Sequence, residues 1–146
     1  MSSLTSQERA ALEIAADAPM LAQVEDWAAV NSGTGNLAGL DLVSRKLADA
    51  FAALPGVIHL VEAEPVEAVL ADGSIKAIER GKHLHLAVRP EAPVRVLLTG
   101  HMDTVFAVDH PFQSLRWLEE GVLNGPGTAD MKGGLSVILA ALGALE

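Results

Sequence analysis

The stretch TGHMDTVF, residues 99–106, directly follows the apolar run VRVLL and places a histidine and an aspartate two positions apart. The run predicts a buried strand, so His101 and Asp103 are expected at or just past the strand's C-terminal end. In extended backbone, residues two apart point the same way. That edge of an α/β sheet is where ligands bind. One interpretation is that His101 binds a metal through one ring nitrogen while Asp103 accepts a hydrogen bond from the other.

A second stretch, NGPGTADMKGG at residues 124–134, follows about one hairpin later. It joins a Gly-Pro-Gly loop to Asp130 and to a glycine pair at the start of a predicted helix. Asp130 is a candidate N-cap. Two glycines in a first turn lower helix propensity, however, and are better explained if the backbone must approach another group closely. Because both stretches follow strands, we expect His101 and Asp130 to be presented to one point.

Other interpretations of these stretches stay open. His-x-Asp alone also fits an ordinary surface turn, since short motifs match by chance. A phosphate site is disfavoured, because Asp130 stands where the dinucleotide fingerprint needs glycine and Lys132 is followed by glycine instead of serine or threonine. His83 and His85 share one face of a predicted strand and could bind metal, although an exposed strand face explains them equally well. Lys132 is expected on a helix surface.

The composition excludes several classes of protein. The chain of 146 residues carries 10 Lys and Arg against 19 Asp and Glu, a net charge of −9, which argues against nucleic acid and anionic membranes as partners. With no cysteine, disulfides and thiolate metal sites are excluded, so any metal must be bound by His, Asp or Glu. The sequence predicts no signal peptide and no transmembrane helix, and a cytoplasmic protein is expected.

Hydrophobic periodicity predicts helices first, strands next and a helix last. Helices are expected at residues 6–16, 20–30 and 40–54, and again from Met131. Hairpins are expected around Asp72-Gly73 and near Glu120-Gly121, and residues 82–90 are expected to pair with the run at 94–100. The fold class is therefore α/β, a mixed twisted sheet with helices on its faces. The last helix still carries apolar residues in phase at Glu146, so we expect the fold to be incomplete there.

The motifs LLTGHMDTVF and GPGTADMKGG, in this order and spacing, resemble those of the aminoacylase, acetylornithine deacetylase and glutamate carboxypeptidase family of dizinc hydrolases. The loop VNSGTGN resembles one in the carboxypeptidase branch. The resemblance implies that His101 binds one zinc and that Asp130 bridges two. It assigns Asp103 to the catalytic site, where it supports His101. Zinc is the implied cofactor, with cobalt or manganese as alternatives.

The resemblance also implies what the chain does. It predicts the N-terminal portion of a catalytic domain, residues 1–146, without the lid or dimerisation domain and without the family's later glutamate pair and ligands. The complete enzyme is expected to hydrolyse the amide bond of an N-acyl amino acid or of a C-terminal residue with a free carboxylate, and to form a homodimer. The chain alone is expected to be inactive. The alternative is a non-catalytic binding or regulatory module that keeps the fold.

Overall fold

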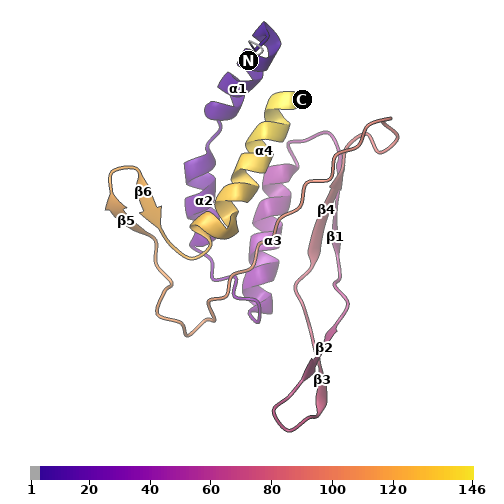
Figure 1. Ribbon diagram of the computed structural model, residues 1–146, viewed down its shortest axis with the longest axis vertical. Coiled ribbons are helices and arrows are strands. Elements are labelled where there is room, and N and C mark those ends of the chain that lie inside the picture. Colours follow the sequence, from indigo (N-terminus) through magenta and orange to yellow (C-terminus); the bar gives the residue numbers. More distant parts are fainter. Residues whose placement is uncertain (1–3) are drawn as a thin grey trace.

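The computed structural model describes residues 4–146 and has the order of elements that the periodicity predicts, three helices, six strands and a last helix (Figure 1). The α/β class is confirmed. Thr5 caps the first helix in a reciprocal arrangement with Glu8, and the Asn36 side chain caps the third by accepting from the amide of Gly39 at 3.2 Å. The α-helices are α1 (Ser6–Ala16), α2 (Met20–Ala28), α3 (Leu37–Phe51) and α4 (Gly133–Leu145).

The strands form three separate two-stranded antiparallel sheets. The predicted hairpins at Asp72-Gly73 and Glu120-Gly121 are confirmed, with Gly73 and Gly121 at φ values of 81° and 80° that favour glycine. The pairs are β1 (Val57–Val61) with β4 (His83–Ala87), β2 (Val66–Val69) with β3 (Ile75–Ile78), and β5 (Arg116–Glu119) with β6 (Val122–Asn124).

The prediction of a buried strand at residues 94–100 is wrong. This segment has no regular strand pairing, and its apolar side chains are exposed, up to 85% for Leu97. Its expected partner, β4, pairs with β1 instead. Apolar composition alone does not say which neighbour a strand takes, because pairing is decided by contacts that are distant in sequence.

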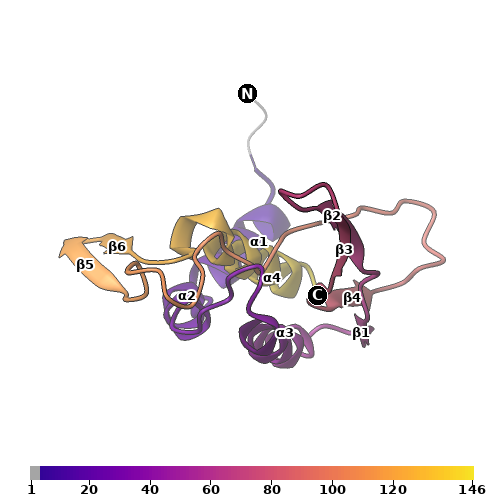
Figure 2. The same ribbon diagram turned by 90° about the horizontal axis from the view of Figure 1, so that it is seen from below.

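The hydrophobic core lies where α4 meets α2 and α3, with the β1–β4 ribbon packed on the outside of α3 (Figures 1 and 2). In both views the β5–β6 hairpin and the β1–β4 ribbon lie on opposite sides of the helices. The inward-facing Leu84 and Leu86 of β4 join this core. The buried members are Trp27, Val43, Leu47, Leu54, Leu135 and Leu139.

One stretch, Thr128–Leu145, has the length and mean hydropathy (1.3) of a membrane span. Its first five residues form a separate turn, and Asp130 and Met131 in that turn have non-helical dihedral angles. The helix that remains, α4, has 13 residues, fewer than the roughly 20 that a bilayer requires. Leu135 and Leu139 of α4 are buried in the core, so we interpret α4 as a core helix.

The core packing of α3 is testable with two matched leucines. Leu47 is buried and Leu42 is about half exposed on the same helix. Leu47→Ala is expected to lower the free energy of unfolding by about 2–4 kcal/mol, because it leaves a cavity, and Leu42→Ala by less than about 1 kcal/mol. Chemical denaturation measures both, and equal losses would contradict this packing.

Candidate metal centre

His101 and Asp130, 29 positions apart, meet in space. The Nε2 atom of His101 lies 2.9 Å from Oδ1 of Asp130. The other ring nitrogen, Nδ1, lies 3.2 Å from Oδ1 of Asp103 and 3.1 Å from the backbone carbonyl oxygen of that residue. The imidazole therefore lies between two carboxylates, one at each nitrogen, and the structure brings together all three residues that the motifs single out.

The two contacts of the imidazole cannot both be ordinary hydrogen bonds of the neutral ring. A neutral imidazole has one N–H donor, and Asp103 offers two acceptors to Nδ1. With the proton on Nδ1, the lone pair of Nε2 faces a carboxylate oxygen of Asp130. Two acceptors at this distance require a cation between them, either a proton or a metal ion. In the metal-free chain the cation is a proton. The hydrogen bond to Asp130 raises the pKa of His101, so the ring keeps a proton on both nitrogens more readily than a free imidazole does.

The donor set fits part of a zinc site. Imidazole nitrogen and carboxylate oxygen bind zinc at about 2.0–2.2 Å, so two such ligands at a tetrahedral angle lie about 3.3 Å apart. The observed 2.9 Å needs to open by only a few tenths of an ångström. The Asp130 side chain is 87% exposed, and its carboxylate is therefore accessible to a second ion.

The candidate centre opens into a cavity of about 340 Å³. Phe106 and Phe112 form part of its apolar wall, with their rings in an edge-to-face contact at 4.9 Å. The remaining lining combines the two carboxylates and the imidazole with small residues of the Gly-Pro-Gly loop. A cavity with an apolar wall and convergent polar groups is typical of a small-molecule site.

Asp130 is not an N-cap. It lies in a short helical turn, η1 (Thr128–Lys132), and α4 begins only at Gly133 with no side-chain cap. At Gly133 a Cβ atom would lie 2.6 Å from the carbonyl oxygen of Thr128, closer than real contacts allow. The glycine therefore permits the close backbone approach that the sequence suggested, and the turn directs the Asp130 carboxylate toward His101.

Lys132 is buried, and its predicted place on a helix surface is wrong. It is 1% exposed, and its Nζ atom donates to the carbonyl oxygen of Val30 at 3.2 Å. Its stem packs beneath Gly127, and its backbone N–H donates to the carbonyl of that residue at 2.8 Å. Burial lowers the pKa of Lys132 to about 8. The side chain thus ties the Asp130 turn to the end of α2. The signal in the sequence was a lone charge inside the apolar stretch 131–145.

The loop after α2, residues 31–36, docks on the segment that carries His101. Gly33 and Thr104 form a parallel bridge, and the hydroxyl of buried Ser32 donates to the carbonyl of Met102 at 2.8 Å. The side chain of Asn31 donates to the carbonyl of Phe106 at 3.0 Å. These bonds hold residues 102–106 in place although the segment pairs with no strand of a sheet. No motif pointed to this docking.

Other acidic and histidine side chains do not add to the centre. Among residues 4–146, no group of three or more His, Asp or Glu side chains is placed to hold a metal ion. His83 and His85 stack at 6.0 Å on the exposed face of β4. Glu119 and Glu120 are exposed at the β5–β6 turn, as the sequence suggests. The structure therefore offers two metal donors, His101 and Asp130, with Asp103 behind the first.

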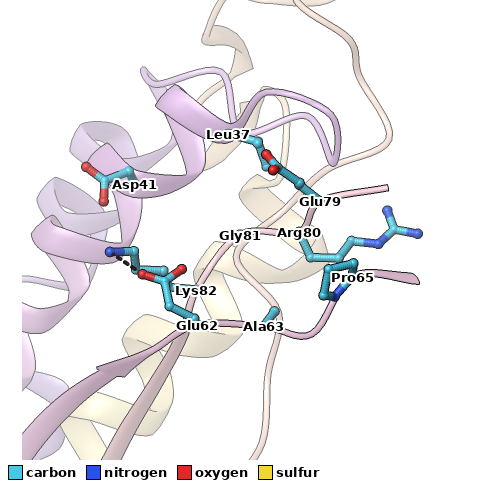
Figure 3. Close-up of a pocket in the computed structure, with 9 residues that line it drawn as sticks. All are labelled: Leu37, Asp41, Glu62, Ala63, Pro65, Glu79, Arg80, Gly81 and Lys82. Atoms are coloured by element: carbon cyan, nitrogen blue, oxygen red, sulfur yellow. Dashed lines mark ion pairs between the residues drawn. The ribbon is translucent and has the colours of Figure 1, made fainter. Parts of the chain in front are cut away.

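A second hollow, of about 330 Å³, lies beside the start of α3 (Figure 3). Its charged groups are largely satisfied within the protein. Lys82 pairs with Glu62 at 2.9 Å across the floor, and Asp41 pairs with Arg45. Charges that compensate each other leave little to recognise a ligand, so we assign no function to it.

The anchoring role of Lys132 is testable against an exposed lysine. Lys132→Ala is expected to lower the free energy of unfolding by about 2 kcal/mol or more, because it removes the buried stem and leaves the Val30 carbonyl without its donor. The control is Lys76→Ala on exposed β3, with an expected change within about 0.5 kcal/mol. Chemical denaturation compares them; similar values for both variants would show that Lys132 does not anchor the turn.

Comparison with known proteins finds one family model and one relative that are similar to part of the chain. Residues 97–146 match the sequence model of Peptidase family M20/M25/M40. The chain is also similar to a protein of Deinococcus radiodurans named [LysW]-lysine hydrolase, with 47% identity over 60 residues. That alignment covers 41% of this chain and 16% of the relative. The segment from residue 97 onward, which holds His101, Asp103 and Asp130, is thus similar to Peptidase family M20/M25/M40.

Proposed function

We propose that the chain belongs to Peptidase family M20/M25/M40 and supplies part of the metal centre of a hydrolase. The observation that carries the proposal is the 2.9 Å approach of His101 Nε2 to Asp130 Oδ1, with Asp103 at the other ring nitrogen. The family match over residues 97–146 and the hydrolase name of the relative support it. The metal is zinc, with cobalt or manganese as alternatives that accept the same ligands.

Each of the three residues has a separate task in this proposal. Asp103 accepts a hydrogen bond from Nδ1–H of His101, so the Nε2 lone pair is directed at the metal position. Asp130 supplies a negative charge at the same position and is exposed enough to bridge to a second ion. Bound zinc would supply Lewis acidity toward a carbonyl group and would lower the pKa of a bound water.

The substrate proposed for the complete enzyme is an amide, either an N-acyl amino acid or a peptide with a free C-terminal carboxylate. The resemblance to aminoacylases, acetylornithine deacetylase and glutamate carboxypeptidase supports this class, and a relative named for hydrolysis of a lysine conjugate fits it. Residues 1–146 would form the N-terminal portion of the catalytic domain. We also propose that the complete enzyme is cytoplasmic and forms a homodimer.

Zinc binding tests the two proposed ligands. Titration of the metal-free chain with zinc, followed by calorimetry, is expected to show binding that weakens at least about tenfold in His101→Ala and in Asp130→Ala, since each removes one of two protein donors. His85→Ala, on the exposed face of β4, is the matched control and is expected to bind as the wild type does. Equal affinity in the wild type and His101→Ala would refute the assignment.

Activity of this chain alone gives a separate test. Among residues 4–146 no third donor joins His101 and Asp130, and the carboxylates that line the cavity are those already assigned, Asp103 and Asp130. With zinc added, the chain is expected to show no turnover above background against a panel of N-acyl amino acids and short peptides. His101→Ala controls for contaminating hydrolases. Turnover near 1 s⁻¹ or faster that is lost in His101→Ala would contradict the expectation.

A further inference from the structure

Thr34 is the polar residue of the docked loop that reaches the candidate metal centre. Its hydroxyl lies 2.6 Å from Oδ2 of Asp103, while the other oxygen of that carboxylate faces Nδ1 of His101. A carboxylate is acceptor-only when ionised, so the hydroxyl donates to it. The contact joins residues 69 positions apart, and no motif in the sequence indicated it.

The backbone around Thr34 fixes where this hydroxyl points. The amide of Thr34 donates to the carbonyl of Thr104 at 3.0 Å, and the amide of Thr104 donates to the carbonyl of Ser32 at 2.8 Å. These bonds on both sides of the Gly33–Thr104 bridge clamp the loop onto the segment that carries Asp103. Gly33 allows the close approach, because a Cβ atom there would lie 2.4 Å from the carbonyl oxygen of Phe106.

We propose that Thr34 is a positioning residue for the metal centre, acting through Asp103 on His101. With one oxygen of Asp103 bonded to Thr34, the carboxylate cannot rotate freely, and its other oxygen stays in line with Nδ1. The proton of the neutral imidazole is then held on Nδ1, and Nε2 keeps its lone pair for a cation. The order of contacts is Thr34, Asp103, His101 and then the ion shared with Asp130.

This inference rests on the proposed function, but its main test needs no metal. In the metal-free chain at a pH where the imidazole is neutral, ¹⁵N chemical shifts of the His101 ring report which nitrogen carries the proton. Asp130 favours the proton on Nε2, whereas the carboxylate and the backbone carbonyl of Asp103 both favour it on Nδ1, and only the carboxylate contacts Thr34. Thr34→Val, which removes the hydroxyl at nearly constant shape, is expected to shift the population toward Nε2–H. Thr34→Ser is expected to restore the wild-type balance.

Ser32→Ala is the matched control. It removes a hydroxyl that docks the same loop but bonds to the Met102 carbonyl instead of to a carboxylate. It is expected to lower stability without moving the tautomer balance. An unchanged balance in Thr34→Val, or an equal shift in Ser32→Ala, would overturn the proposal. If Thr34→Val does not fold, the Thr34 hydroxyl proton of the wild type decides: slow exchange with water supports the hydrogen bond, and fast exchange overturns it.

Zinc affinity supplies the second measurement. Thr34→Val is expected to weaken zinc binding about threefold to tenfold, less than loss of His101, because groups behind a ligand cost about 10–100-fold when removed directly and Thr34 acts one contact further away. If the wild type binds no zinc, the proposed function fails, while the tautomer balance of His101 still tests whether Thr34 positions Asp103. If the wild type binds zinc but Thr34→Val leaves both affinity and tautomer unchanged, only the role of Thr34 fails.

Discussion

The Nε2 atom of His101 and a carboxylate oxygen of Asp130 lie 2.9 Å apart, and this contact governs the candidate centre. Two acceptors repel unless a cation lies between them. When the neutral imidazole donates its single proton from Nδ1 to Asp103, Nε2 is left as an acceptor, and the chain presents a position for positive charge that its own neutral groups cannot fill. A metal ion satisfies this position, and a proton on the imidazole is its substitute in the metal-free chain.

The rest of the structure brings those two side chains to one point. Asp130 depends on the turn that Gly127, Gly133 and buried Lys132 fix against the end of α2. His101 depends on an extended segment without a neighbouring sheet strand, held instead by the loop at residues 31–36. The turn with Asp130 continues directly into α4, and α4 packs against α2 and α3. This packing therefore fixes the turn relative to the loop at residues 31–36, which connects α2 to α3. The site is therefore built by loops that are docked on a helical core.

The sequence predicted much of this arrangement because the deciding signals were local. Apolar periodicity located α1 to α3, and Asp72-Gly73 and Glu120-Gly121 located two hairpins. The ends of the helices were predicted less accurately than their existence. Helix α3 begins at Leu37, three residues earlier than expected, because Asn36 caps it. The approach of His101 to Asp130 was also expected, since both follow predicted strands. What failed was the partner of β4, which is chosen by long-range contacts.

Two contributors to the site were not predicted, for different reasons. Lys132 is a charged residue at the start of a helix, where exposure is the usual outcome, and only the three-dimensional packing beneath Gly127 buries it. Thr34 lies in the Gly- and Asn-rich loop VNSGTGN, and neither its turn residues nor its resemblance to a carboxypeptidase loop named a contact for the threonine side chain. Its 2.6 Å bond to Asp103 spans 69 positions, and single-sequence periodicity carries no information about such a pair.

The most direct test is the position of the metal itself. Crystals of the chain grown with zinc, measured at the zinc absorption edge, are expected to show an anomalous peak about 2.0–2.2 Å from both His101 Nε2 and an Asp130 carboxylate oxygen. Zinc found only at other histidines, such as His83 and His85, or no peak between His101 and Asp130 with both side chains ordered, would contradict the account.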